Sequence, residues 1–313
     1  MRLLTAVLSV GMSLAAGSWA CAADNAGCGV VKMSDPGWTD IGATNGVAGV
    51  LLEGLGYQQQ VQNLSVALAY QGLKTGQLDV FLGNWMPAQQ PVIAKYTADG
   101  SVEVLGANLN NAKFTLAVPD YVARGGVKDF ADLAKYGDRF SRKIYGIAPG
   151  APANQNIKTM LDKHDFNLTG WTLVESSESG MLAQVDRAVA KQQWIVFLGW
   201  EPHAMNTHHK LVYLSGGDKY FGPDYGSATV NTVTRKDYGA QCPNTARLFS
   251  QLTFNVDLEN GLIKRALDDK QTPREAAREE LKQHPELLSR WLTGVSTRQG
   301  RPGLAAVRQS LGL

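Results

Sequence analysis

The apolar and polar positions along the chain alternate in a way that predicts short strands separated by helices. The strand candidates are short apolar runs, as expected for buried strands. They cover residues 29–33, 59–64, 80–82, 102–105, 115–118, 144–147, 172–174, 194–198, 211–214 and 228–233. The helix candidates cover residues 41–55, 66–74, 154–163, 178–190, 243–252 and 258–267. This alternation indicates parallel βαβ units and an α/β fold.

The C-terminal part of the chain has a different character. From residue 272 onward it is charged and predicted to be helical, with interruptions at Pro285 and Gly294. No linker rich in proline, glycine and serine joins two consecutive domains in the sequence. Two domains are therefore expected only if the chain crosses between them more than once, and residues 108–113 and 215–218 are the candidate crossings.

Three tryptophans share one local context. Trp38, Trp85 and Trp200 each come shortly after an apolar run that is predicted to be a strand. Side chains just past the ends of strands point into the crevice in which open α/β sheets bind ligands. Indole faces carry negative potential, so several of them around one crevice suit a cation that has no N–H donors. Taken singly, each tryptophan is better explained as a core residue, and only their shared position favours a binding site.

The first 23 residues have the features of a secretory signal peptide. Arg2 precedes an apolar stretch that is too short for a membrane span, and small residues follow it at Ala20 and Ala22. We expect cleavage after Ala22 or Ala23 and a mature protein in the periplasm. Cys21 is not expected to carry a lipid anchor, because the residues before it include a tryptophan and lack the usual aliphatic side chain.

Charge and cysteine content narrow the possibilities further. The 313-residue chain has 30 Lys and Arg against 28 Asp and Glu, so it lacks the basic footprint of a nucleic-acid-binding protein. Cleavage would leave Cys28 and Cys242 as the only cysteines. In an exported chain these two are expected to form a disulfide, and two free buried thiols are the alternative.

Motifs of known enzyme classes are scarce. The sequence has no nucleophile elbow, P-loop or dinucleotide fingerprint with the correct flanking residues. His203, His208 and His209 cluster, but their spacing matches no strong zinc pattern, so surface and capping roles are expected. We therefore expect no metal, no cofactor and no enzyme activity. The alternative from another class is a secreted enzyme that uses Asp40, Glu201 and His203.

Long motifs surround the three tryptophans and extend to other parts of the chain. They are Gly-Trp-Thr-Asp at 37–40, Asp-Val-Phe-Leu-Gly-Asn-Trp-Met-Pro at 79–87, Tyr-Gly-Ile at 145–147, Val-Glu-Ser-Ser-Glu-Ser-Gly-Met-Leu-Ala-Gln at 174–184 and Val-Phe-Leu-Gly-Trp-Glu-Pro-His at 196–203. Through them, essentially the whole mature chain resembles the periplasmic choline-binding proteins of ABC transporters, within the glycine betaine, carnitine and choline group.

This resemblance implies an α/β, two-lobed type II periplasmic binding fold, with the ligand cleft between the lobes. After a signal peptide at 1–23, lobe I would comprise residues 24–111 and 215–313, and lobe II residues 112–214. The family's disulfide matches Cys28 with Cys242.

The resemblance also implies a set of ligand-binding residues. In the family, three tryptophans and a tyrosine enclose a trimethylammonium group. Trp38, Trp85 and Trp200 match the tryptophans, whereas Phe114 occupies the tyrosine position. Asp40 matches an aspartate that faces the ligand.

One position departs from the family pattern in a way that affects the ligand. The family asparagine that meets the choline hydroxyl follows a Pro-Gly pair, and here Ala151 follows that pair, with Asn154 and Asn156 beyond it. Asn154 is included among the expected ligand-binding residues.

These implications predict a monomeric solute-binding protein that delivers a quaternary ammonium compound, foremost choline, to an inner-membrane ABC permease. A charge at Asp40 favours a cation over a zwitterion, because a ligand carboxylate placed nearby would be repelled. Carnitine or glycine betaine is the alternative ligand, since the change at Ala151 leaves the polar contacts undefined. A receptor domain that signals rather than imports is a third possibility.

Overall fold

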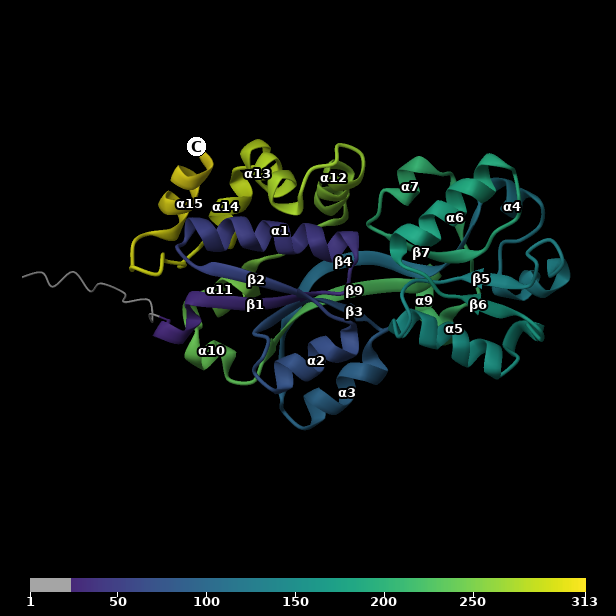
Figure 1. The fold of residues 1–313 in the computed structure, drawn as a ribbon, viewed down its shortest axis with the longest axis horizontal. Helices are drawn as coiled ribbons and strands as arrows, with labels where there is room; N and C mark the ends of the chain where they lie inside the picture. The colour runs from purple at the N-terminus through teal and green to yellow at the C-terminus, as the bar shows by residue number, and fades with distance from the viewer. Residues whose placement is uncertain (1–23) are drawn as a thin grey trace, which may run out of the picture.

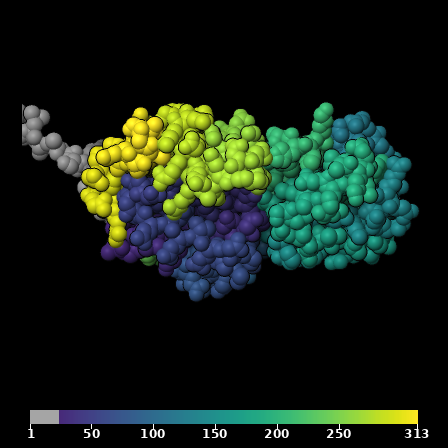
Figure 2. Space-filling model, turned by 45° about the horizontal axis from the view of Figure 1, so that its top comes forward, coloured from purple at the N-terminus to yellow at the C-terminus, as the bar shows by residue number. Residues whose placement is uncertain are grey.

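The computed structural model describes residues 24–313, and the predicted signal peptide, including Cys21, lies outside the described residues. The described part forms two lobes of unequal size (Figures 1 and 2). No helix in residues 24–313 is long and apolar enough to cross a membrane.

One mixed sheet runs through both lobes in the strand order β2-β1-β3-β9-β4-β7-β5-β6, with β8 paired to β4. Its strands are β1 (Val30–Asp35), β2 (Gln58–Asn63), β3 (Val80–Met86), β4 (Val102–Pro119), β5 (Lys143–Tyr145), β6 (Thr172–Val174), β7 (Phe197–Glu201), β8 (Leu211–Tyr213) and β9 (Ser227–Arg235). Strands β1, β2 and β3 are parallel to one another, and so are β5, β6 and β7, as the alternation of elements predicts. The α/β fold class is confirmed.

Lobe I holds both termini of the described chain and surrounds the β2-β1-β3-β9 part of the sheet (Figure 1). Its helices are α1 (Thr39–Gly54), α2 (Val66–Lys74), α3 (Gln90–Ala98), α10 (Tyr238–Gln241), α11 (Pro243–Gln251), α12 (Val256–Leu267), α13 (Pro273–Gln283), α14 (Glu286–Trp291) and α15 (Gly303–Leu311). Helices α1 and α12 to α15 lie on one side of the sheet, with α2 and α3 on the other.

Helix α1 is buried because α13 packs across it. Twelve of its sixteen residues are buried, which explains its many small and apolar side chains. A Cβ at Gly46 would collide with the backbone oxygen of Pro273, so a glycine is needed for α13 to come this close. The start of α13 is fixed by a capping box between Thr272 and Glu275, with Pro273 in the first turn.

Lobe II surrounds the other end of the sheet. Its helices are α4 (Asp120–Arg124), α5 (Pro152–Asp162), α6 (Glu178–Ala190), α7 (Met205–His208), α8 (Asp218–Phe221) and α9 (Pro223–Gly226). Strands β4, β7, β5 and β6 form its part of the sheet, and the β-strand pairing places Phe114 of β4 directly opposite Trp200 of β7.

The two lobes are joined by strands that belong to both. Strand β4 is a single element, whereas the sequence pattern predicts separate strands at 102–105 and 115–118. The polar and glycine-containing residues between them stay paired to β9, with register shifts that keep the ladder continuous. The predicted first crossing at 108–113 therefore lies inside a strand.

The residues after the predicted second crossing, at 215–218, contact segments of the predicted lobe II. Ser215 donates a hydrogen bond to Asp129, and Asn156 donates one to the backbone oxygen of Tyr220. Phe221 packs against Phe130, with ring centroids 5.7 Å apart. These partners lie within the predicted lobe II, so we infer that the chain returns to lobe I along β9, about a dozen residues after the boundary predicted at 215. Gly216 and Gly217 resemble a hinge in the sequence, but the residues that follow them contact these partners, and the exact boundary of the lobes stays a prediction.

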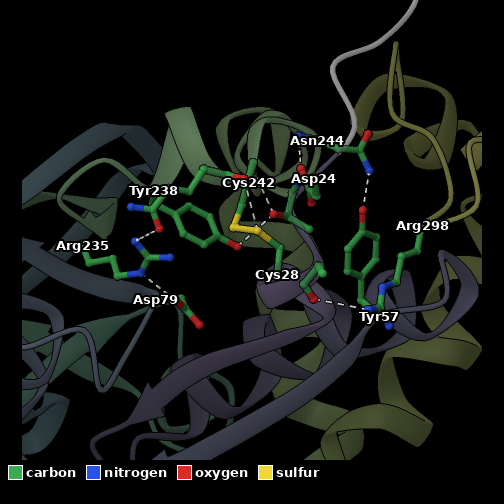
Figure 3. Close-up of a disulfide and its surroundings, with 12 residues drawn as sticks. Asp24, Cys28, Tyr57, Asp79, Arg235, Tyr238, Cys242, Asn244 and Arg298 are labelled. Atoms are coloured by element: carbon green, nitrogen blue, oxygen red, sulfur yellow. Dashed lines mark hydrogen bonds and ion pairs between the residues drawn. A yellow bond between two sulfur atoms is a disulfide. The ribbon is translucent and has the colours of Figure 1, made fainter.

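The predicted disulfide is confirmed. Cys28, in the 3-10 turn Ala26–Gly29, is bonded to Cys242, with Cα atoms 5.8 Å apart, and both residues are buried (Figure 3). Next to it, the backbone N–H of Asn244 donates to the carboxylate of Asp24 at 2.6 Å. The start of the described chain is thereby fixed to the beginning of α11.

Candidate functional site

The three tryptophans converge on one cavity, although two of them lie inside strands rather than after them. Trp38 is the N-cap of α1, shortly after β1, as predicted. Trp85 and Trp200 are the next-to-last residues of β3 and β7. The predicted strands end too early because Gly83 and Gly199 resemble breaks, but pairing with β9 and β4 continues past both glycines.

The cavity lies between the lobes and is almost entirely apolar. Lobe I contributes Trp38, Asp40, Trp85, Ala88 and Gln89, and lobe II contributes Phe114, Ile147, Pro152, Ala153 and Trp200. The space open to the centre of a water molecule is about 30 Å³, which exceeds the roughly 10–15 Å³ that one water needs. The site is therefore a small, partly open chamber whose walls come from both lobes.

Aromatic rings form most of these walls. Trp85, Phe114 and Trp200 are each less than 10% exposed. The ring centroids of Trp85 and Phe114 lie 6.1 Å apart. Because β4 and β7 are paired, Phe114 and Trp200 stand side by side across adjacent strands. Such rings can contact the methyl groups of a quaternary ammonium and attract its charge through their faces.

Asp40 is the acidic group of the cavity. It lies in the first turn of α1 and accepts a hydrogen bond of 3.0 Å from the indole N–H of Trp85. The pKa of Asp40 is raised to about 8, chiefly by burial and also by the charge of Glu178, while the Trp85 hydrogen bond opposes the shift. A cation in the cavity would favour the ionised form of Asp40.

Asp40 belongs to a group of carboxylates that affect one another. Asp35 and Glu178 both act to raise the pKa of Asp40, and Asp40 in turn helps burial to raise the pKa of Glu259 well above its usual value. We call these four residues the acidic cluster. A cation bound nearby would stabilise the ionised forms of these groups, so the chamber suits a positively charged ligand.

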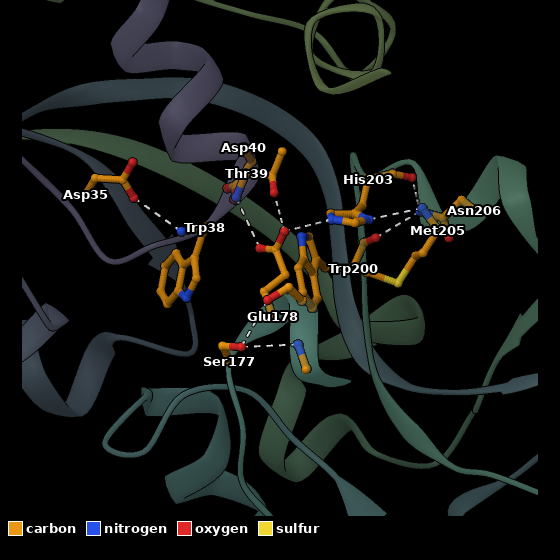
Figure 4. Close-up of polar contacts among 12 residues, drawn as sticks. Asp35, Trp38, Thr39, Asp40, Ser177, Glu178, Trp200, His203, Met205 and Asn206 are labelled. Atoms are coloured by element: carbon orange, nitrogen blue, oxygen red, sulfur yellow. Dashed lines mark hydrogen bonds and ion pairs between the residues drawn. The ribbon is translucent and has the colours of Figure 1, made fainter. Parts of the chain in front are cut away.

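Glu178 was not predicted to belong to the site, and His203 was named only for the secreted-enzyme alternative, but the structure places both beside the cavity (Figure 4). Glu178 is 6% exposed and lies 3.1 Å from Nε2 of His203. Nδ1 of His203 accepts a hydrogen bond from the backbone N–H of Met205, so Nε2 carries the proton and donates to Glu178. The surface position expected for His203 is wrong, because this side chain is 1% exposed.

The other histidines of the predicted cluster lie apart from the cavity. His208 pairs with Asp268 and His209 with Asp186. Within residues 24–313, no group of three or more histidine, cysteine, aspartate or glutamate side chains is arranged to hold a metal ion.

Asn154 does not line the cavity. It is 1% exposed, and its side-chain oxygen accepts from the backbone N–H of Ile147 at 3.0 Å. Its amide nitrogen donates to the backbone oxygen of Ile147 and to Glu175. The structure therefore shows Asn154 supporting the loop that carries Ile147, and a direct contact with a ligand stays a prediction.

The remaining polar side chain of the cavity is already paired. Gln89 donates to the backbone oxygen of Gly83 at 2.6 Å and accepts from the hydroxyl of Tyr70 at 2.8 Å. No lysine, arginine or histidine is among the described residues that line the cavity. The chamber thus offers one carboxylate and several ring faces, with no basic group for a ligand carboxylate.

A two-lobed α/β protein that encloses an aromatic, acidic chamber between its lobes has the form of a solute-binding protein. The family described as the substrate binding domain of the ABC-type glycine betaine transport system matches residues 29–283. The chain belongs to this family, which is a class of binding domains and not of enzymes.

Solved structures agree with this assignment. An ABC-transporter choline-binding protein in complex with choline is 50% identical, with a TM-score of 0.90 over 91% of this chain and 99% of that one. The unliganded, semi-closed form of an ABC-transporter choline-binding protein is also 50% identical, with a TM-score of 0.84 over 92% of this chain and 100% of that one. Lactococcal OpuAC, closed on glycine betaine, is 27% identical, with a TM-score of 0.76 over 84% and 98%. By TM-score the structure matches the choline complex better than the semi-closed form.

Proposed function

We propose that this protein binds choline between its lobes in the periplasm and presents it, as a monomer, to the permease of an ABC importer. The observation that carries the proposal is the chamber itself, with Trp38, Trp85, Phe114 and Trp200 as walls and Asp40 as its charged group. The two similar choline-binding structures support it.

The strength of such binding is physically reasonable. A quaternary ammonium cannot donate hydrogen bonds, and each desolvated contact with a ring face contributes about 2 kcal/mol. Three or four such walls supply most of the roughly 8 kcal/mol that micromolar affinity requires. Phe114 preserves a ring face where the family has tyrosine and removes only a hydroxyl.

The polar contacts favour a cation over a zwitterion. The carboxylate of glycine betaine or carnitine would need donors and would be repelled by Asp40, whereas the described lining offers no basic side chain. The choline hydroxyl, in contrast, could donate to Asp40. Carnitine or glycine betaine remains the second candidate, because lactococcal OpuAC binds glycine betaine with the same fold.

Calorimetry on protein stripped of ligand tests the proposal against choline, glycine betaine, carnitine and acetylcholine. We expect choline to bind most tightly, with micromolar or better affinity. Tighter binding of glycine betaine or carnitine would overturn choline as the ligand, and turnover of any of these compounds would favour the secreted-enzyme alternative.

A further inference from the structure

Glu178 joins the two lobes next to the chamber. It is the first residue of α6 in lobe II, and Ser177 caps that helix. Across the cleft, Oε2 of Glu178 accepts from the backbone N–H of Thr39 at 3.1 Å, and Oε1 accepts from the hydroxyl of Thr39. Thr39 lies between Trp38 and Asp40 at the start of α1, so this contact holds the lobes together at the edge of the chamber (Figure 4).

The carboxylate of Glu178 is also held in position by His203, which packs against the chamber wall Trp200. His203 donates to Oε1 of Glu178, and its ring packs edge-on against Trp200, with centroids 4.9 Å apart. The position of Glu178 is therefore fixed by lobe II before the lobes meet. When they meet, Thr39 supplies the remaining donors.

Closure also brings a second carboxylate close to the chamber. Glu178 is almost fully buried in the closed form and faces Asp40, with Asp35 and Glu259 completing the acidic cluster. Burying several carboxylates together is unfavourable when the chamber is empty. A cation in the chamber offsets this repulsion, whereas a zwitterion offsets it only in part.

We propose that Glu178 is a positioning and specificity-determining residue that couples closure of the lobes to the presence of a cation in the chamber. The proposal rests on the proposed function, since it assumes a cationic ligand. Glu178 gives the closed form hydrogen bonds that the open form lacks, and its charge makes that form favourable chiefly when a cation is bound. A ligand can shift a conformational equilibrium only through such differential contacts.

A second contact between the lobes serves as a comparison. His208 of α7 pairs with Asp268 at the end of α12 at 2.9 Å, and both side chains are partly exposed to solvent. An exposed pair of this kind contributes little because solvent and salt screen it. We therefore expect closure to depend on the buried Glu178–Thr39 contact and only weakly on the His208–Asp268 pair.

The test compares Glu178→Gln and Glu178→Ala with Asp186→Asn. Asp186 lies on the same helix, carries the same charge and bonds only within lobe II, to His209. Each variant is titrated with choline and glycine betaine by calorimetry, and its radius of gyration is measured by small-angle scattering with and without ligand. Circular dichroism verifies that each variant is folded.

We expect both Glu178 variants to lose at least tenfold in choline affinity and less in betaine affinity, and to show a smaller ligand-induced change in radius. Asp186→Asn should match the wild type. Thr39→Val should weaken choline binding, Thr39→Ser should restore it, and the Thr39→Val and Glu178→Ala losses should not add, because the two residues form one contact.

The outcomes separate this proposal from the one on which it rests. If the wild type binds choline and contracts, but Glu178→Gln keeps the same affinity ratio and the same contraction, the coupling role of Glu178 is wrong. The same follows if Asp186→Asn loses as much affinity as Glu178→Gln. If the wild type binds none of the quaternary compounds, the proposed function fails and this inference fails with it.

Discussion

At the scale of single residues, the tryptophans divide into walls of the chamber and parts of the core. Trp85 lines the cavity, whereas Trp171 packs against Phe140 inside lobe II, with ring centroids 5.6 Å apart. We expect Trp85→Ala to weaken choline binding at least tenfold, because a desolvated cation–π wall contributes about 2 kcal/mol.

The matched control is Trp171→Ala, since both changes remove a buried indole. It should leave the choline affinity of the folded protein unchanged in calorimetry. Equal losses in the two variants would mean that Trp85 acts through general packing and not as a wall.

Asp40 should set the preference between a cation and a zwitterion. Asp40→Asn keeps an oxygen that can accept from Trp85 but removes the charge, so choline should lose more affinity than glycine betaine. Parallel titrations of both ligands measure the difference between the two losses. A larger loss for betaine would mean that Asp40 is not the charge selector, and would favour a zwitterionic ligand.

The pKa of Asp40 predicts that choline binding depends on pH. Because the pKa is raised to about 8 in the empty protein, Asp40 is largely protonated at pH 7. A cation favours the ionised form, so binding should release a proton. Affinity should therefore rise as pH increases from 6 to 8, by up to about tenfold per pH unit, and level off above the free-protein pKa.

Calorimetry in buffers of different ionisation enthalpy counts the protons released. Asp40→Asn should abolish most of the release, although Asp35, Glu178 and Glu259 face the same region. Because the pKa of Asp40 is raised in the folded protein, Asp40 contributes stability to folding while it is protonated. This contribution is fully present near pH 4 and is lost as the pH rises through 8. The empty Asp40→Asn protein should thus melt above the wild type at pH 8.

At the scale of elements, the sequence predicts most of the scaffold because strongly periodic segments have few alternatives. Helices α2 and α6 begin and end where the pattern places them. Strand β4 was divided in the prediction, because its continuity depends on pairing with β9 rather than on local hydrophobicity. Helix α3 was missed, since only two of its residues, Ile93 and Tyr96, are buried.

The sequence also predicts most residues of the site, because they stand in distinctive local patterns. Trp38, Trp85, Phe114, Trp200 and Asp40 stand in motifs long enough to be recognised, and the structure brings them together. The partnership of Glu178 with Thr39 and His203 could not be predicted from local patterns. Thr39 is 139 residues away and lies in the other lobe, and His203 is 25 residues away within lobe II. A signal was present at Ser177, whose helix-capping position fixes the start of α6.

The disulfide holds the N-terminal element onto α11. By the chain-entropy estimate a loop of this size contributes on the order of 4–5 kcal/mol to stability. We expect the double substitution Cys28→Ser and Cys242→Ser to lower the Tm by roughly 10 °C in calorimetry. Peptide mapping without reductant should find the two cysteines linked in the wild type.

The elements that the disulfide joins, the turn at Ala26–Gly29 and the start of α11, lie at the end of lobe I that is remote from lobe II (Figure 1). The double variant should therefore keep its choline affinity below its melting temperature. A large loss of affinity would contradict a purely stabilising role for this bond.

At the scale of the whole molecule, the ligand joins two bodies. The lining of the chamber is shared between lobe I and lobe II, and the chain crosses between them in β4 and β9. In an open form the aromatic walls would be separated, and only the closed form would give choline all of its contacts. Choline should therefore shift the population toward the closed form.

Small-angle scattering measures this shift directly. The radius of gyration of the ligand-free protein should decrease on addition of saturating choline, toward the value calculated from the enclosed structure described here. Trp85→Ala, at a choline concentration that saturates only the wild type, should keep the larger radius and so serves as the control. If choline binds tightly and the radius does not change, the chamber is already closed before binding. Glu178 and Thr39 would then hold the lobes together without ligand, and entry of choline would have to occur through brief openings of that contact.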